Sequence, residues 1–422
     1  RLGAEPSNLP ILQSVKASEA VSSIIMVHAS ADTHLTEWGC KALHTLCRDD
    51  MANHAKPRTG GEIQAVVWAI QRQGSFVEVA EWSTRVFSAL AGISVNAKKF
   101  GGSGGCEAII NLAKTHSRIP TVCEQACQVI HDLALDENNR AWLGASGGCD
   151  IVGTVLRHHS ENASVCTTAS LAVGKLACNH EGNSARLRSI GMCEKILEVL
   201  ERHVNHESCA DSTCYAVFEL SKFKENVHVM SELEVCQKVM AAMIAHSQVD
   251  AVDKHALQAI QRLSLPEFQK NFMVLSNEEM LQHIVNVLSS QEVSTSSEVS
   301  VEGCKVINHL AVTEENKHLL GAAGACRALI TMLRIHHTTS DQVVAHVAVS
   351  CAKLAKDCEE NVTRFLDQSS CELFLECLDE HKSSDGTIIS VFQCLYYLSS
   401  SPITRSMILA HEDVFREIVR FI

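Results

Sequence analysis

The sequence predicts an all-α protein, a solenoid of stacked three-helix repeats, each about 43–45 residues long. Three markers recur in register along the chain: an asparagine, an anchor residue ten positions later, and a leucine near the end of the repeat. A fixed period of this length indicates supersecondary units that bury their apolar faces only by stacking on one another. The asparagine occurs at Asn53, Asn96, Asn139, Asn183, Asn226, Asn271, Asn316 and Asn361.

The anchor begins the first long helix of each repeat. From Cys193, apolar side chains follow at the third, fourth, sixth and seventh positions, which is one face of an α-helix. The anchors are small or apolar and are predicted to be buried: Ile63, Cys106, Cys149, Cys193, Cys236, Leu281, Cys326 and Cys371.

The leucine, called the closing leucine below, ends the second long helix. The residue three positions before it is apolar, and the residue four positions before it is small or β-branched, so this face is expected to pack closely. The closing leucines are Leu46, Leu90, Leu133, Leu176, Leu220, Leu263, Leu310, Leu354 and Leu398.

A short third helix is predicted between the asparagine and the anchor. Glycine at Gly104, Gly147, Gly191 and Gly324 suits the position just past its end, and asparagine is a good N-cap for its start. The connection from Leu263 to Asn271 is longer than its equivalents and contains Pro266, which predicts an irregularity there.

Residues 1–18 are predicted to be an N-terminal flank, and residues 19–422 a single solenoid. Its units are expected to start near residues 19, 53, 96, 139, 183, 226, 271, 316 and 361, with a half-unit from residue 405. The chain begins without Met and ends within an apolar run, so we expect a fragment or processed segment of a larger polypeptide.

Composition restricts the environment and the partners. The chain has no run of about 18 apolar residues and no signal-peptide pattern, which predicts no membrane span and no secretion. Nineteen cysteines in register with the repeat favour a reducing, cytoplasmic location, with nucleus and cytoskeleton as the alternatives. A net charge of −13 argues against nucleic acid as a partner.

No residue pattern indicates an enzyme, a cofactor or a metal site. The glycine-rich Phe100–Cys106 segment recurs as a repeat turn and lacks the lysine of a phosphate-binding loop. Only Cys123 and Cys127 lie four residues apart on one helix, so the cysteines are interpreted as small buried hydrophobes.

Histidine recurs ten residues after the anchor, at the end of the first long helix. We expect these rings to cap the terminal carbonyls of that helix, with a pH-sensitive edge as the alternative. The residues are His116, His159, His203, His246, His336 and His381.

This arrangement, with segments such as EENKHLLGAAGACRALITML, resembles the armadillo repeat. HEAT repeats are the second choice, but they have two helices instead of three. The resemblance implies a right-handed superhelix whose concave groove is lined by the closing-leucine helices. Positions −8, −5 and −1 from the closing leucine then form one exposed stripe, here called the groove stripe. Importin-like members carry Asn at −1 and Trp at −5, and this chain has neither, which argues against a nuclear-import adaptor.

The groove stripe supplies the candidate partner-binding residues. It is basic relative to the rest of the chain, and its tryptophans near the N-terminus would suit protein segments with acidic and apolar side chains. The alternative for both tryptophans is packing against the flank Arg1–Ala17. The candidates are Trp38, Lys41, Trp82, Arg85, Gln125, Gln128, Asp132, Lys175, Tyr215, Glu219, His255, Arg262, Lys305, His309, Lys353 and Tyr397.

The predicted function is therefore a protein–protein interaction scaffold without catalytic activity, within a larger protein or complex. Two alternatives remain open. One is a structural module packed into a cytoskeletal or other large assembly, and the other is a regulatory array attached to an enzyme elsewhere in the chain.

Overall fold

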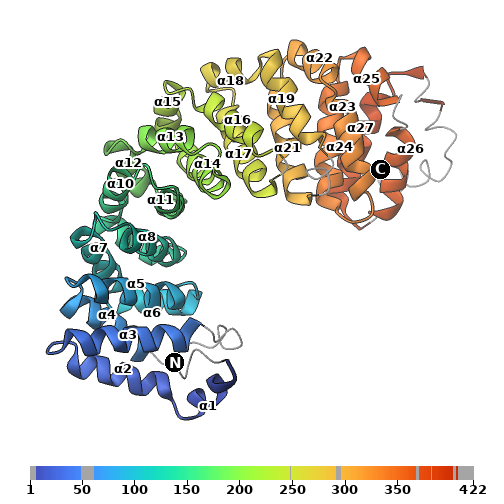
Figure 1. Ribbon diagram of the computed structural model, residues 1–422. Helices are drawn as coiled ribbons and strands as arrows, with labels where there is room; N and C mark the ends of the chain where they lie inside the picture. Colours follow the sequence, from blue (N-terminus) through green and yellow to red (C-terminus); the bar gives the residue numbers. More distant parts are fainter. Residues whose placement is uncertain are drawn as a thin grey trace. The chain divides into compact units, whose positions relative to one another are not determined.

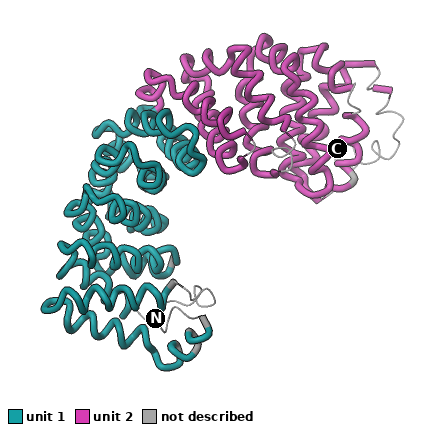
Figure 2. The backbone as a smooth tube through the Cα atoms, in the orientation of Figure 1, with its two compact units in different colours: residues 1–226 teal, residues 227–422 magenta. Residues whose placement is uncertain are grey.

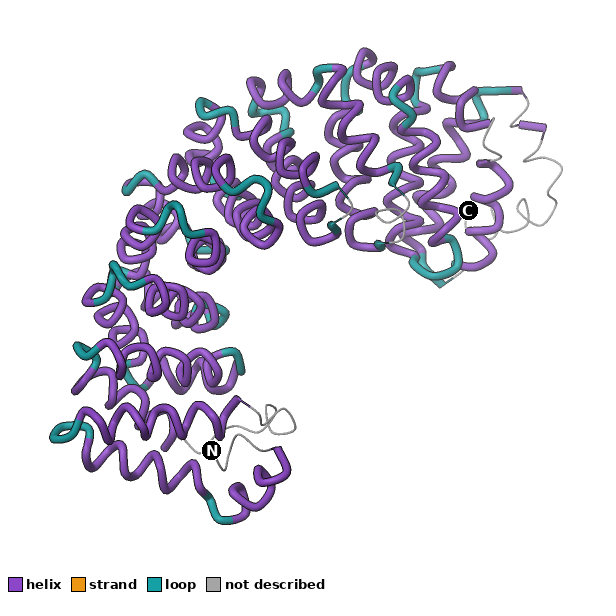
Figure 3. The backbone as a smooth tube through the Cα atoms, in the orientation of Figure 1, coloured by secondary structure: helices purple, strands orange, loops and turns teal. Residues whose placement is uncertain are grey.

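The computed structural model of the chain is helical throughout the part that it describes, which is residues 6–48, 61–247, 249–290, 296–366, 370–381, 383–402 and 405–406 (Figures 1 and 3). These residues contain helices and loops and no strand. The chain divides into two compact units, residues 1–226 and residues 227–422, which are coloured separately in Figure 2. Each unit is described by itself.

Unit 1 begins with a short 3-10 helix, Pro6–Asn8, followed by α1 (Leu9–Ser14) and α2 (Ala17–His28). Helix α2 packs against both α3 and α4, so it takes the place of a first long helix in the opening repeat.

The closing helices carry the closing leucines and pack one on the next within each unit. In unit 1 they are α3 (Thr33–Arg48), α5 (Val77–Ala91), α8 (Pro120–Leu133), α11 (Ala163–Ala177) and α14 (Glu207–Ser221). In unit 2 they are α17 (Asp250–Leu263), α21 (Ser297–Leu310), α24 (Asp341–Ala355) and α27 (Asp385–Leu398). In Figure 1, α8, α11 and α14 lie on one side of the unit 1 stack, and α7 and α10 on the other.

The anchor helices form the second layer. They are α4 (Gly61–Gln73), α7 (Gly105–Thr115), α10 (Gly148–His158) and α13 (Met192–Arg202) in unit 1. In unit 2 they are α16 (Val235–Ala245), α19 (Glu278–Leu288), α23 (Ala325–His336) and α26 (Ser370–Glu380). All eight anchors are buried, which confirms the anchor cysteines as core residues, and this burial raises the pKa of the Cys106 thiol to about 12.

The short helices complete the repeats. They are α6 (Ser94–Gly102), α9 (Glu137–Ala145), α12 (Glu181–Ser189), α18 (Gln269–Leu275), α22 (Glu314–Ala322) and α25 (Glu359–Leu366), with α15 (Lys224–Ser231) at the division between the units. Gly147 follows α9 with a φ of 96°, in the left-handed region that a side chain disfavours, as predicted for a residue past a helix end. Three further glycines also have a positive φ just past a short helix: Gly104 after α6, Gly191 after α12 and Gly324 after α22.

The recurring asparagine is not an N-cap, and that prediction was wrong. The N-cap lies three residues earlier, where the side chains of Asp136, His180 and Thr313 accept hydrogen bonds from the backbone N–H of the asparagine. The asparagine side chain is buried and joins two repeats. Asn183 begins a repeat, and its Nδ2 donates to two carbonyls of the repeat before: Leu176 O, of the closing leucine, at 3.0 Å and Arg140 O at 3.1 Å.

The same asparagine clamp recurs along the chain, because one buried amide can satisfy two carbonyl groups that would otherwise be orphaned. Asn361 Nδ2 bonds Leu354 O at 3.0 Å and Lys317 O at 2.9 Å. Asn226 and Asn316 each bond the closing leucine and a serine hydroxyl of the repeat before.

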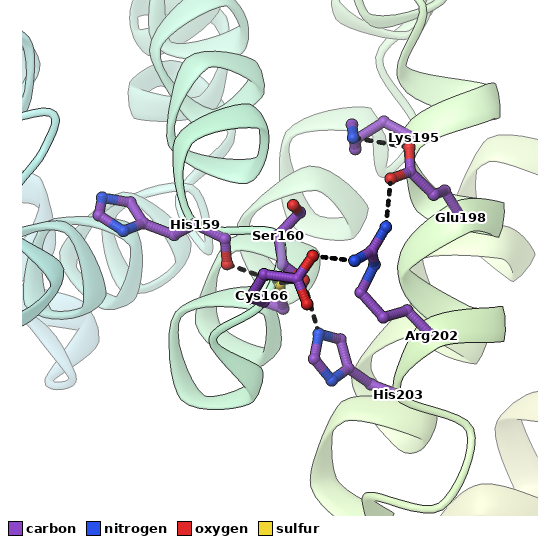
Figure 4. Close-up of polar contacts among 8 residues, drawn as sticks. His159, Ser160, Cys166, Lys195, Glu198, Arg202 and His203 are labelled. Carbon is purple, nitrogen blue, oxygen red and sulfur yellow. Dashed lines mark hydrogen bonds and ion pairs between the residues drawn. The ribbon is translucent and has the colours of Figure 1, made fainter.

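The recurring histidines lie where predicted but bond a different partner. His116, His159 and His203 are the C-cap residues of α7, α10 and α13. Their Nε2 atoms, however, bond carbonyls of the preceding repeat. His203 Nε2 lies 2.7 Å from Ser160 O, beside the contacts of Arg202 with Glu198 (Figure 4). His381 Nε2 similarly bonds His337 O, so the ring is a connector between repeats and not a cap of its own helix.

Candidate interaction surface

The groove stripe lies on the closing helices of both units, as the positions −8, −5 and −1 predict. Among its sixteen candidate residues, Asp132 and Glu219 are buried and the others are at least partly exposed. The closing helices therefore bury their apolar face and present this stripe to solvent.

The N-terminal end of the stripe is a stack of aromatic and cationic side chains from α3 and α5. The Lys41 ammonium lies 4.3 Å from the centre of the Trp38 ring and 5.3 Å from that of Trp82. The Arg85 guanidinium, which follows Trp82 by three residues on α5, lies 4.7 Å from the centre of the Trp82 ring. We call these four residues the tryptophan cluster. It combines aromatic faces with two cationic side chains, of which Lys41 also pairs with Glu37 on the same helix at 2.5 Å.

Trp38 is 65% exposed, so the described part of the flank, residues 6–17, does not cover it. Trp82 is half-buried, and its ring meets the edge of the His44 ring at 5.8 Å. The alternative of flank packing therefore fails for Trp38 among the described residues. A large exposed indole beside a cation is a feature that protein interfaces favour.

The part of the stripe on α8, in the middle of unit 1, consists of polar side chains that form hydrogen bonds within their own helix. Gln128 Nε2 donates to Asp132 Oδ1 at 2.9 Å, and His131 Nδ1 lies 3.0 Å from the same oxygen. The neighbouring Gln125 is partly exposed. This part of the stripe has little charge left for a partner.

The last two closing helices of unit 1 follow the same pattern. The Lys175 ammonium lies 5.6 Å from the Tyr215 ring, and burial raises the pKa of Tyr215 above its usual value, with Glu219 adding to it. Glu219 pairs with Lys222 at 2.8 Å. Unit 1 therefore holds both acidic groups of its stripe in internal contacts, Glu219 in an ion pair and Asp132 in hydrogen bonds.

Unit 2 carries a different set of side chains on its stripe. His255 and Arg262 lie on α17, Lys305 and His309 on α21, and Lys353 on α24. Lys305 pairs with Glu302 at 2.9 Å. His309 Nδ1 donates to Gln261 O at 3.0 Å, and Lys353 Nζ donates to Asn308 O at 2.7 Å.

Tyr397 ends the stripe on α27 and lies beside residues that the sequence reasoning missed. The Lys356 ammonium is 5.9 Å from its ring, and the adjoining Tyr396 ring is 72% exposed. Both tyrosines line a pocket of about 550 Å³ with Ala355, Cys358 and Ser399. Lys356 lies two residues beyond the closing leucine Leu354. It is therefore outside the three stripe positions, and helical spacing does not predict it.

Trp142 was also missed. It lies on the short helix α9, is 55% exposed, and its indole N–H donates to the Glu107 carboxylate. Because it is off the closing helices, no stripe position includes it.

Neither a metal site nor a membrane span emerges from the described residues. In that part of the chain, no group of three or more His, Cys, Asp or Glu side chains is arranged to hold a metal ion. No single described helix is long and apolar enough to cross a bilayer, and the bent pair α22 and α23 meets only the criteria of length and composition. All nineteen cysteines are free thiols, and all but Cys178 are buried.

Comparison with known proteins supports the architecture. A family model described as "Protein zer-1 homolog-like, C-terminal domain" matches residues 211–392. No curated protein matches the chain in sequence.

Solved structures resemble almost the whole chain. An engineered protein is similar with a TM-score of 0.76 and 16% identity, over 94% of this chain and 92% of its own. A β-catenin structure, from work on a phosphorylation switch that controls the interaction between cadherin and β-catenin, has a TM-score of 0.65 and 13% identity. It covers 90% of this chain and 69% of its own. The chain is thus an armadillo-like α-solenoid.

Proposed function

We propose that this chain is a protein-interaction scaffold that binds partner segments along the groove stripe of its closing helices, without covalent chemistry. The tryptophan cluster is the observation that carries the proposal. Trp38 leaves 65% of its surface in solvent beside Lys41, although burying an indole in the core would be favourable.

The chemistry of the cluster indicates the class of partner. The Lys41 and Arg85 charges would attract carboxylates, and the indole rings would cover apolar side chains. An acidic and apolar segment of another protein combines both. The armadillo-like fold supports this function because its repeats display such positions on a stiff series of helices.

The test uses the chain as bait for capture from a cell extract, followed by identification and purification of the bound protein. Binding of that purified protein is then measured for the wild type and for the double variant Trp82→Ala with Arg85→Ala. We expect the double variant to weaken binding by more than about 2 kcal/mol, as for an interface hot spot.

The matched control is Trp142→Ala, which removes another half-exposed tryptophan that lies off the stripe. It also tests the second candidate function, a structural module that packs through faces other than the stripe, because the exposed Trp142 favours such a contact. Loss of binding in Trp142→Ala with no loss in the double variant would replace the scaffold proposal with the structural one.

A further inference from the structure

A line of cationic side chains crosses three consecutive closing helices of unit 2. Arg262 on α17, His309 on α21 and Lys353 on α24 each stand immediately before the closing leucine. These helices pack in this order, α17 on α21 and α21 on α24, as Figure 1 shows. We call these three residues the cationic row.

Hydrogen bonds hold two members of the row in place. His309 Nδ1 donates to Gln261 O, and Lys353 Nζ donates to Asn308 O. In both cases the acceptor is the residue two before the closing leucine of the preceding closing helix. The side chains therefore lean across the gap between repeats in the same way. Because Nδ1 of His309 is the donor, Nε2 is the nitrogen that gains a proton when the ring becomes charged.

The row is poor in counter-charge. Glu267 is the acidic group that acts on His309, whereas Arg262 and Lys353 oppose its protonation from both sides. Partial burial and the nearby Lys317 lower the pKa of Lys353. Burial is the main reason that the pKa of His309 lies below its usual value, and the two cations lower it further. Among the described residues, no ion pair joins Arg262 or Lys353 to a carboxylate.

Two carboxylates on α21, the middle helix of the row, are already paired. Glu302 pairs with Lys305, and Glu298 pairs with Lys254 and has its pKa lowered by that contact. Crowded positive groups without a counter-ion raise the local potential and attract an anion. An anion in contact with the row would relieve this repulsion and favour the protonated form of His309.

The spacing of the row favours an extended chain as the ligand. Packed helices lie about 8–10 Å apart, so the row presents one basic side chain at about that interval. A polyproline II segment rises about 3.1 Å per residue and has three residues per turn, so side chains at every third position line one side at about 9 Å. The row itself has no Phe, Tyr or Trp side chain of the kind on which nucleic-acid bases most often stack, and the chain has a net charge of −13, which together favour a peptide over a single-stranded nucleic acid.

We propose that the cationic row binds an extended acidic segment of a partner protein, with carboxylates at every third residue facing Arg262, His309 and Lys353, and with uptake of a proton at His309. This rests on the proposed function, because both use the stripe of the closing helices, but it concerns a separate site in unit 2.

The test is a fluorescence-anisotropy titration of the full chain with a short fluorescein-labelled peptide that has glutamate at every third position on a proline–alanine background. A second peptide has the same composition with its glutamates adjacent. We expect the spaced peptide to bind more tightly. Its affinity should rise several-fold between about pH 7.5 and about pH 6, because a bound carboxylate raises the lowered pKa of His309 and the complex takes up a proton.

The double variant Arg262→Glu with Lys353→Glu should weaken binding of the spaced peptide by at least about tenfold, because like charges then face each other. The matched control, Lys224→Glu with Arg327→Glu, makes the same change in net charge at two exposed positions on α15 and α23, off the closing helices, and should bind normally. His309→Gln should bind at about pH 7.5 and lose the rise toward about pH 6. If the double charge reversal prevents folding, Arg262→Gln with Lys353→Gln replaces it.

Several results would overturn the proposal: no binding of the spaced peptide, equal affinity for both peptides, or full affinity in the charge-reversed variant. Tighter binding of a single-stranded oligonucleotide at the same residues would assign the row to nucleic acid. If the peptide fails while a partner captured by the chain still depends on Trp82 and Arg85, only this inference fails, and the proposed function stands.

Discussion

The regular repeats of unit 1, from α6 to α13, differ from the first repeats of unit 2, from α16 to α19, in how the recurring asparagine is used. Asn183 in unit 1 bonds two carbonyls. Asn271 in unit 2 is equally buried, but its Nδ2 has no hydrogen-bond partner among the described residues. The connection before Asn271 is the lengthened one with Pro266. The asparagine clamp thus depends on the length of the connection, whereas the helices form in both regions because their apolar faces are buried.

The stripe shows a second contrast between the units. At position −1, unit 1 has a mixture that includes Asp132 and Glu219, each in contact with a basic or amide side chain. Unit 2 has the cationic row at the same position of successive helices. One scaffold therefore presents two surfaces of different charge, although the repeats that carry them share the same core.

The largest effect on the clamp is expected from Gly101→Ala in unit 1. A Cβ at residue 101 would lie 1.8 Å from Oδ1 of Asn139, so the buried amide would have to move and leave its bond to Ala97 O. We expect a loss of about 3 kcal/mol from overpacking and the broken hydrogen bond. Thermal and urea unfolding would measure it.

The neighbouring Gly102 is the control, because a Cβ there meets nothing within 4 Å. Gly102→Ala should leave stability unchanged or raise it slightly, since alanine favours a helix. Similar losses in both variants would mean that the asparagine clamp contributes little in unit 1. In unit 2, Ser276 already stands at the position that corresponds to Gly101 and accepts a bond from Asn316.

The next largest effect is the difference in stability loss between alanine variants of Asn183 in unit 1 and Asn271 in unit 2. Asn183→Ala leaves Leu176 O and Arg140 O without their donor inside the core, and we expect a loss of about 2 kcal/mol. Asn271→Ala should cost less than about 1 kcal/mol, because its Nδ2 makes no hydrogen bond to lose. Urea unfolding of both variants checks this difference. Equal losses would show that the clamp in unit 2 is intact.

The smallest effect concerns the turn after the short helix. Gly191 has a φ of 75° in unit 1, and Glu234 has a φ of 58° at the corresponding place in unit 2. A side chain in this left-handed conformation costs about 1 kcal/mol, so Glu234→Gly should stabilise the protein by about that amount and Gly191→Ala should destabilise it similarly. Calorimetry of the two variants would decide, and a loss of stability in Glu234→Gly would contradict this explanation.

Most of the repeat could be predicted from the sequence. The anchors, the closing leucines and the glycines past the short helices all act locally, through helical periodicity and one backbone conformation. The groove stripe also followed from spacing, and the structure places Trp38, Lys41, Trp82 and Arg85 in contact as expected. Their role in binding a partner stays a prediction.

The errors share one cause, which is that the side chain bonds a different repeat. Asn183 was expected to cap its own helix but bonds Arg140 O in the repeat before, and His203 bonds Ser160 O in the same direction. A single sequence shows that these residues recur, but it does not show which carbonyl lies within reach across the interface.

The sequence by itself determined the period, the three helices of the repeat and the faces that are buried, because these depend on the order of apolar and polar side chains along one helix. Only the tertiary structure decided how repeats are joined and where charge is left without a partner. Those properties depend on atoms that are one repeat apart in the chain, such as those of His309 and Gln261, 48 residues apart, which stacking brings within hydrogen-bonding distance.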